Sequence, residues 1–174
     1  MRWNCLRFDE LSVQQLYSVL ALRSEVFVVE QNCVFLDIDG LDAKTWHLLG
    51  HGDDGQLKAY ARLIPPGLKA PDALIGRVVT SPAARSGGVG RALMTEAVAQ
   101  CEHLWPGQSI TLHAQAHLQR FYASFGFAPV GEQYMEDGIA HQEMQKRSPQ
   151  SAQAPQPPEG VKKPRGGPSP SQET

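Results

Sequence analysis

The sequence predicts an α/β fold in which one mixed β-sheet is covered by helices. Three observations carry this prediction. Short β-type runs alternate with segments of helical periodicity, turn-forming residues separate them, and 41% hydrophobic and 20% charged residues are ordinary for a globular domain. All of these elements fall within residues 1–147 of the 174, so we expect a single domain over that range.

The first part of the chain predicts one helix followed by three strands. Residues 12–26 begin with Ser-x-x-Gln, the form of a capping box, and the helix reaches residue 26 or slightly beyond. Residues 46–50 and 57–64 are short apolar runs around Gly-Asp-Asp-Gly, which is typical of a hairpin. Residues 74–80 are a third β-type run, and Ser81-Pro82 ends it.

The second part of the chain predicts two helices and three more strands. Residues 88–103 carry an apolar stripe and precede Trp-Pro-Gly, which stops a helix. Residues 109–114 alternate between apolar and polar side chains, as a strand does. Residues 118–125 place aromatic and apolar side chains on one helical face, and residues 127–130 and 139–144 are a final pair of strands.

The composition changes sharply after Arg147. Residues 148–174 are rich in Pro, Ser, Gln and Gly, and their largest apolar residue is Val161. Such a segment cannot bury enough surface to offset the entropy lost on ordering it. We therefore expect a disordered C-terminal tail.

Charge and cysteine content exclude several classes of protein. The formal net charge of −2 gives no basic field for nucleic acid. No apolar stretch approaches the ~20 residues that span a bilayer, and the N-terminus lacks the apolar run of a signal peptide. The three cysteines are widely spaced and fit neither a disulfide framework nor a zinc motif. We expect a cytoplasmic protein that contacts no membrane.

The segment after the third strand carries the most informative motif. It reads Arg85-Ser-Gly-Gly-Val-Gly90 and opens a helix. Glycines let a ligand press against the backbone, and the free N–H groups and dipole of a helix N-terminus attract phosphate. The sequence has no P-loop ending and no early dinucleotide fingerprint. We expect a pyrophosphate site formed by Arg85, Ser86, Gly87, Gly88, Val89, Gly90 and Arg91.

Two motifs together resemble a known family. Arg85-x-x-Gly88-x-Gly90 after a strand resembles motif A of the GCN5-related N-acetyltransferases (GNAT), and Tyr122-x-x-x-Gly126-Phe127 resembles motif B. Further segments resemble the ElaA-type branch of that superfamily and extend over nearly the whole of residues 1–147. They are residues 23–31, 37–40, 59–62, 114–119 and 137–141.

The resemblance implies a splayed, mostly antiparallel sheet and acetyl-CoA as donor, with direct transfer to an amine and no metal. It also implies that a backbone N–H near Val78 or Val79 holds the thioester oxygen, an effect typically worth ~3 kcal/mol. Tyr122 is implied as the general acid that protonates the leaving thiolate, its alternative being a core aromatic. Many relatives have Asn seven residues before this tyrosine, and this chain has Gln115 at that coenzyme-binding position.

The acceptor amine has to lose a proton before it attacks, because an amine of pKa ~10 is protonated at neutral pH. The candidate bases are Glu30, Asp37, Asp39, His113 and His117, and spacing singles out none of them. The two histidines also have the spacing of a zinc pair, but they lack a third ligand. The two aspartates would suit a cationic amine or could form a turn. The acceptor, an amine of a small molecule or a peptide, stays open.

Three other interpretations remain. Arg23 and Val26-Phe27 also resemble the opening of acyl-homoserine lactone synthases, which share this fold. The second is a regulatory module that binds acyl-CoA without turnover and recruits a partner, and the third is a purely structural domain. A homodimer also stays open, because no self-complementary surface can be argued from sequence.

Overall fold

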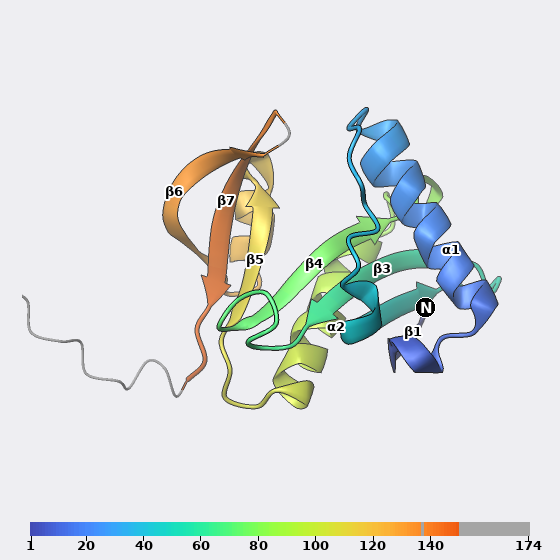
Figure 1. The fold of residues 1–174 in the computed structure, drawn as a ribbon, viewed down its shortest axis with the longest axis horizontal. Coiled ribbons are helices and arrows are strands. Elements are labelled where there is room, and N and C mark those ends of the chain that lie inside the picture. The colour runs from blue at the N-terminus through green and yellow to red at the C-terminus, as the bar shows by residue number, and fades with distance from the viewer. Residues whose placement is uncertain (137, 150–174) are drawn as a thin grey trace, which may run out of the picture.

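The structure is a computed structural model that describes residues 1–136 and 138–149, and these form one open, seven-stranded sheet flanked by helices (Figure 1). The strand order is β1-β2-β3-β4-β5-β7-β6. Among the described strands, β4 and β5 are parallel and the other neighbours are antiparallel, which confirms the mixed, mostly antiparallel sheet. The strands are β1 Arg2–Arg7, β2 Trp46–His51, β3 Leu57–Ile64, β4 Ala73–Thr80, β5 Ile110–Gln115, β6 Ala128–Glu136 and β7 Ile139–Lys146.

The helices begin where their capping signals place them. Ser12 Oγ accepts a hydrogen bond from the Gln15 N–H at 3.1 Å, and Gln15 Oε1 accepts one from the Ser12 N–H at 2.9 Å. This reciprocal capping box starts α1 and satisfies two of its free N–H groups. The helices are α1 Val13–Arg23, which continues as the π-helical η2 Ser24–Glu30, α2 Val89–Leu104 and α3 Gln119–Ala123. The 3₁₀ turns are η1 Phe8–Glu10, η3 Asp42–Lys44, η4 Pro82–Ala84 and η5 Ala116–Leu118.

The two long helices cover opposite faces of the sheet (Figure 1). Val19 and Leu22 of α1 pack against Tyr60 and Val79 on one face. Leu93 of α2 belongs to a larger cluster on the other face, together with side chains of α3. Because strand side chains alternate between faces, each central strand contributes to both clusters. This arrangement fixes β3 and β4 firmly between two layers.

Strands β4 and β5 diverge soon after they meet. Their pairing is limited to Ala73 with Ile110 and Leu74 with Thr111. Figure 1 shows the two strands together at one end and apart at the other. Within the described residues, β4 therefore has no strand beside it on this edge beyond Leu74. Its backbone N–H and C=O groups there are open to another extended chain.

A β-bulge lies at the point where β4 opens. Tyr60 pairs with Val79 and Arg62 pairs with Gly76, so two residues of β4 oppose one residue of β3. Arg77 occupies the bulge with φ of 50°. A non-glycine residue in this left-handed region is strained, and such strain persists only where surrounding contacts hold it. The contacts that hold Arg77 belong to the candidate site.

Two strands differ from the sequence prediction. Strand β1 was not predicted. It pairs antiparallel with β2, and the indole ring of Trp3 lies over its partner Gly50, where an added Cβ would clash with the ring. Strand β6 is nine residues long and exposed throughout, so its sequence lacks the burial alternation that marks strands. The predicted disordered tail lies almost wholly outside the described residues.

Candidate active site

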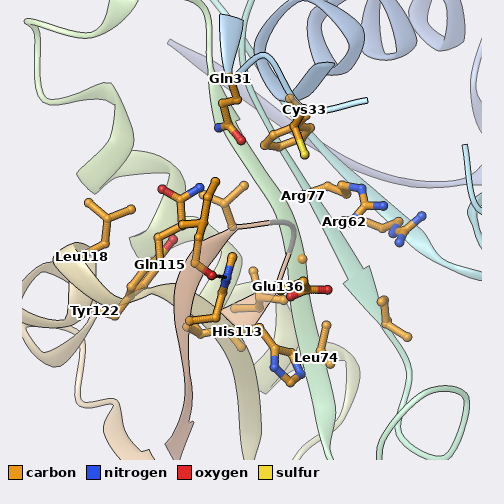
Figure 2. Close-up of a pocket in the computed structure, with 18 of the residues that line it drawn as sticks. Gln31, Cys33, Arg62, Leu74, Arg77, His113, Gln115, Leu118, Tyr122 and Glu136 are labelled. Atoms are coloured by element: carbon orange, nitrogen blue, oxygen red, sulfur yellow. Dashed lines mark hydrogen bonds between the residues drawn. The ribbon is translucent and has the colours of Figure 1, made fainter. Parts of the chain in front are cut away.

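A cavity of about 520 Å³ lies in the opening between β4 and β5 (Figure 2). Its walls come from β3, β4 and β5, from the segment that follows α1, from η5 and α3, and from the paired strands β6 and β7. The cavity combines apolar walls with a few convergent polar groups, which is typical of a small-molecule site. The polar side chains that line the cavity include those of Arg77, His113, Gln115, Tyr122, Tyr134 and Glu136.

The predicted coenzyme contacts within the sheet divide between the two faces of β4. Val78 lines the cavity, as does Gln115 at the end of β5. Val79 is buried on the opposite face, where it packs beside α1. Its side chain therefore does not reach the cavity. A backbone N–H of this bulged stretch is still open to the cavity edge, because β5 has already diverged.

The glycine loop forms the N-terminus of α2 as predicted. Gly88 is the N-cap with φ of 74°, a conformation that favours glycine, and no side chain caps this end. At Gly87 and Gly90, neither the backbone conformation nor packing within the protein requires a glycine. A Cβ added at Gly87 would meet no heavy atom within 4 Å, and one at Gly90 would only touch Thr80 and Phe121 at 4.0 Å. The loop thus presents backbone N–H groups and open space, which suits an anion.

The arginines of this loop have partners within the protein. Arg85 donates two hydrogen bonds to Glu30, from Nη1 to Oε1 at 2.7 Å and from Nη2 to Oε2 at 2.8 Å. The hydrogen bonds from Arg85 lower the pKa of Glu30. Arg91 lies over the ring of Phe125, with its guanidinium carbon 5.0 Å from the ring centroid. Glu30 does not line the cavity, and the structure places this predicted base against Arg85 of the glycine loop instead.

Tyr122 is buried in α3 and lines the cavity. Its ring meets Phe121 and Phe127 edge to face, which fixes its orientation. Burial raises the pKa of Tyr122 to about 12, so the phenol stays protonated throughout the neutral range. Within the described part of the chain, no residue hydrogen-bonds to its hydroxyl. The group is therefore positioned to donate into the cavity.

The two candidate histidines lie in different surroundings. His113 of β5 lines the cavity, and its Nδ1 is 2.5 Å from the hydroxyl of Tyr134 (Figure 2). Partial desolvation of the ring at the cavity wall lowers the pKa of His113 below its ordinary value, which favours the neutral imidazole that a base requires. Both histidines are exposed, but His117 lies on η5 and does not line the cavity. The two therefore differ in position, with His113 beside the cavity and His117 outside it.

The two predicted acidic residues after α1 are held by arginines. Arg23 Nε and Arg77 Nε each donate to the Asp37 carboxylate, at 2.8 and 2.7 Å. Arg62 binds both oxygens of Asp39, at 2.8 and 2.6 Å. The hydrogen bonds from Arg62 hold the pKa of Asp39 well below its usual range. These carboxylates are already neutralised, so they are not free to receive a cationic amine.

Asp42 joins these pairs into one buried network. Its Oδ1 accepts from Arg23 at 2.8 Å and from Arg62 at 2.9 Å. Burial acts to raise the pKa of Asp42, but the two arginines outweigh it and the pKa is lowered. The network ties the segment after α1 to β3 and to the bulge of β4 at Arg77. It thereby fixes one wall of the cavity and holds the strained backbone there.

The described residues contain neither a metal-binding cluster nor a membrane-spanning helix. No group of three or more His, Cys, Asp and Glu side chains there is arranged to hold a metal ion. None of the helices in residues 1–136 and 138–149 has the length and apolar character needed to cross a membrane.

Comparison with known proteins decides the family. Residues 27–148 match the model of the acetyltransferase (GNAT) domain. The chain belongs to the GNAT family. It is also 50% identical over 143 residues to the protein ElaA of Escherichia coli, covering 81% of this chain and 93% of ElaA. This similarity confirms the ElaA-type branch that the sequence motifs indicated.

Solved structures of GNAT proteins confirm the fold. An acyl-CoA N-acyltransferase from Pseudomonas aeruginosa is 45% identical, with a TM-score of 0.80, over 84% of this chain and 99% of its own. The crystal structure of Escherichia coli ElaA is 48% identical, with a TM-score of 0.78 and the same coverage. The fold and the family therefore support an N-acyltransferase.

Sequence reasoning missed several cavity residues on the second half of the sheet. Tyr134 and Glu136 lie on β6 and His141 on β7, and all three line the cavity. The predicted strand ended at residue 130, before the alternation that places Tyr134 and Glu136 on one face. No burial alternation marks residues 131–136, and the register shifts between Val130 and Tyr134, so the sequence carried no local signal for them.

Proposed function

We propose that this GNAT protein transfers an acetyl group from acetyl-CoA directly to an amine of a small molecule or peptide. The observation that carries the proposal is the free edge of β4, which runs from the bulge at Arg77 to Thr80. A Cβ on Gly90 would lie 4.0 Å from Thr80, so the end of this edge is close to the N-terminus of α2. Backbone hydrogen-bonding groups and an anion site thus lie next to each other. Acetyl-CoA has the matching order of groups, an amide-bearing arm followed by a pyrophosphate.

The arm of the coenzyme would add to β4 as an extra strand, since its amides match unpaired backbone groups. The pyrophosphate would lie at the N-terminus of α2, over Gly87, Gly88 and Gly90, with the Ser86 and Val89 backbone beside it. The thioester would then lie near Val78, where a backbone N–H can stabilise the oxyanion by ~3 kcal/mol. The backbone of Val79 and the side chain of Gln115, at the end of β5, would also contact the coenzyme arm.

Tyr122 would act on the departing sulfur. Its pKa of about 12 lies above the ~8.5 of a thiol, so complete proton transfer to sulfur is uphill. A hydrogen bond from the neutral phenol instead stabilises the thiolate as the C–S bond breaks. This refines the general-acid role expected from the sequence.

His113 is the candidate base that the geometry favours, because it lines the cavity in its neutral form. Glu30 is bound to Arg85, and His117 lies on η5 outside the cavity wall. Removing a proton from the acceptor ammonium lets its nitrogen attack the thioester carbon.

A thiol-release assay across polyamines, amino acids, aminoglycosides and peptide amines tests the proposal. We expect release above the hydrolysis background with acetyl-CoA for one of these classes. Longer acyl-CoA donors in parallel separate an acetyltransferase from a synthase that uses long acyl chains. Saturable binding of acetyl-CoA without release on any amine would instead favour the regulatory module.

A further inference from the structure

Three titratable rings from three neighbouring strands form one group on the cavity wall. Strand β7 lies between β5 and β6, and Tyr134 pairs in register with His141. The ring of Tyr134 stacks on that of His141, with centroids 6.0 Å apart and planes inclined by 25°. The Tyr134 hydroxyl then reaches diagonally across β7 to Nδ1 of His113. The contact therefore depends on all three strands.

We propose that Tyr134 positions His113 and carries the amine's proton from it to solvent, with His141 supporting the tyrosine ring. This inference rests on the proposed function. Tyr134 occupies Nδ1, so Nε2 is the nitrogen left to face the acceptor. Within the described residues, Nε2 of His113 has no hydrogen-bond partner.

The acceptor's proton leaves the site through His113 and Tyr134. The acceptor ammonium gives one proton to Nε2 of His113, and its freed nitrogen forms a bond to the thioester carbon. The surplus N–H proton of the resulting tetrahedral adduct passes to the sulfur as the C–S bond breaks with its electron pair, so an amide and a free thiol leave. The Nδ1 proton of His113 passes to the oxygen of Tyr134, and the phenol's own proton passes to water. Tyr134 is 37% exposed, which gives that proton a route out.

The charges around His113 set its protonation. Desolvation lowers the pKa of His113, and Lys69 and His141 act in the same direction, while Glu143 and Glu136 act to raise it. The net direction is downward, so the neutral ring predominates at neutral pH. The two glutamates still stabilise the imidazolium once it forms.

The phenol of Tyr134 can pass a proton on, but it does not ionise at neutral pH. Burial, followed by Glu136 and Glu143, raises the pKa of Tyr134. It therefore keeps its proton until another one arrives at its oxygen.

The test compares Tyr134→Phe with Tyr17→Phe, a matched control at a 76% exposed position on α1. The first variant keeps the stacked ring and removes only the hydroxyl. Nitrogen NMR of the histidine rings, recorded against pH without substrate, reports on His113 directly. We expect its titration midpoint to fall in Tyr134→Phe, because the imidazolium loses a hydrogen-bond acceptor, and to stay unchanged in the control.

The same two proteins are assayed with acetyl-CoA and the best amine. We expect kcat to fall roughly tenfold or more in Tyr134→Phe, with the KM for acetyl-CoA unchanged. An unmoved His113 titration would overturn the positioning role, and a moved titration with unaltered kcat would overturn the proton path. If wild-type protein shows no turnover, the proposed function fails, and the titration alone decides whether Tyr134 positions His113.

Discussion

Arg85 in the glycine loop forms a bidentate ion pair with Glu30 at the end of η2, with N–O distances of 2.7 and 2.8 Å. The two residues are 55 positions apart in sequence and were expected to have separate roles, one toward phosphate and one as a base. Their contact means that a phosphate approaching Arg85 competes with the Glu30 carboxylate. It also ties the segment beside the cavity to the loop before α2.

Glu30→Gln should therefore strengthen binding of coenzyme A and leave turnover largely intact. Both side chains are 42% exposed, and exposed ion pairs contribute little, so we expect a change of roughly two- to fivefold in Kd. Titration calorimetry at low and high salt measures it. A loss of turnover by two orders of magnitude would instead make Glu30 the base.

Gly90→Ala should weaken coenzyme binding without lowering the stability of the fold. The added Cβ touches only Thr80 and Phe121 at 4.0 Å, and alanine exceeds glycine in helix propensity by about 1 kcal/mol. We expect an equal or higher melting temperature together with coenzyme binding weakened at least tenfold. Gly87→Ala is a second variant with open space around its Cβ. Undiminished affinity in both variants would remove the loop from the coenzyme site.

Tyr122→Phe should lower turnover and leave coenzyme affinity almost unchanged. The ring contacts with Phe121 and Phe127 are kept, and only the donor to the sulfur is lost. A fall of about 10- to 100-fold in kcat is expected from the loss of such a proton donor. Steady-state kinetics and calorimetry measure the two effects separately, and equal turnover would exclude Tyr122 from the reaction.

Protonation of His113 should reduce kcat/KM on the acid side of the pH profile. Since desolvation outweighs the nearby glutamates and lowers the pKa of His113, kcat/KM should rise with an apparent pKa below ~6.5. His113→Gln should reduce activity and abolish that limb, whereas ionisation of the amine still governs the alkaline side. Persistence of the acid limb in the variant would assign it to another group.

Asp42→Asn should destabilise the protein by about 3 kcal/mol, because Arg23 and Arg62 lose a buried anion. The pKa of Asp42 is lowered on folding, so its contribution is present above the unfolded value of ~3.9 and is lost as pH falls through the folded one. The gap between wild type and variant in urea unfolding should thus narrow below about pH 4. Asp53→Asn, at a 97% exposed side chain, is the control and should stay within about 0.5 kcal/mol. A pH-independent gap would contradict the ionic origin.

The sequence predicted those parts of the fold that are determined by interactions between residues close together in the chain. The capping box at Ser12, the glycine loop before α2 and the central strands could be predicted because each has its own pattern. Strand β1 depends on Trp3 lying over Gly50, which is a tertiary contact without a local pattern. The fully exposed β6 likewise shows no burial alternation.

The candidate site divides in the same way. The proposed coenzyme contacts follow motifs that are contiguous in sequence, so Tyr122 and the loop at Arg85 could be proposed from the sequence alone. The proposed acceptor side is assembled from side chains far apart along the chain, such as the Arg62 and Asp39 pair and the His113 and Tyr134 pair. Pairings of this kind are set by strand order and register, which single-sequence reasoning does not supply.

Mass spectrometry of the products formed from acetyl-CoA and the best amine of the screen tests direct transfer. Direct transfer predicts one acetylated amine for each coenzyme A released, with no acetyl group retained on the protein. Binding of acetyl-CoA without any acetylated amine, or an acetyl group trapped on a side chain, would contradict direct transfer in the cavity between β4 and β5.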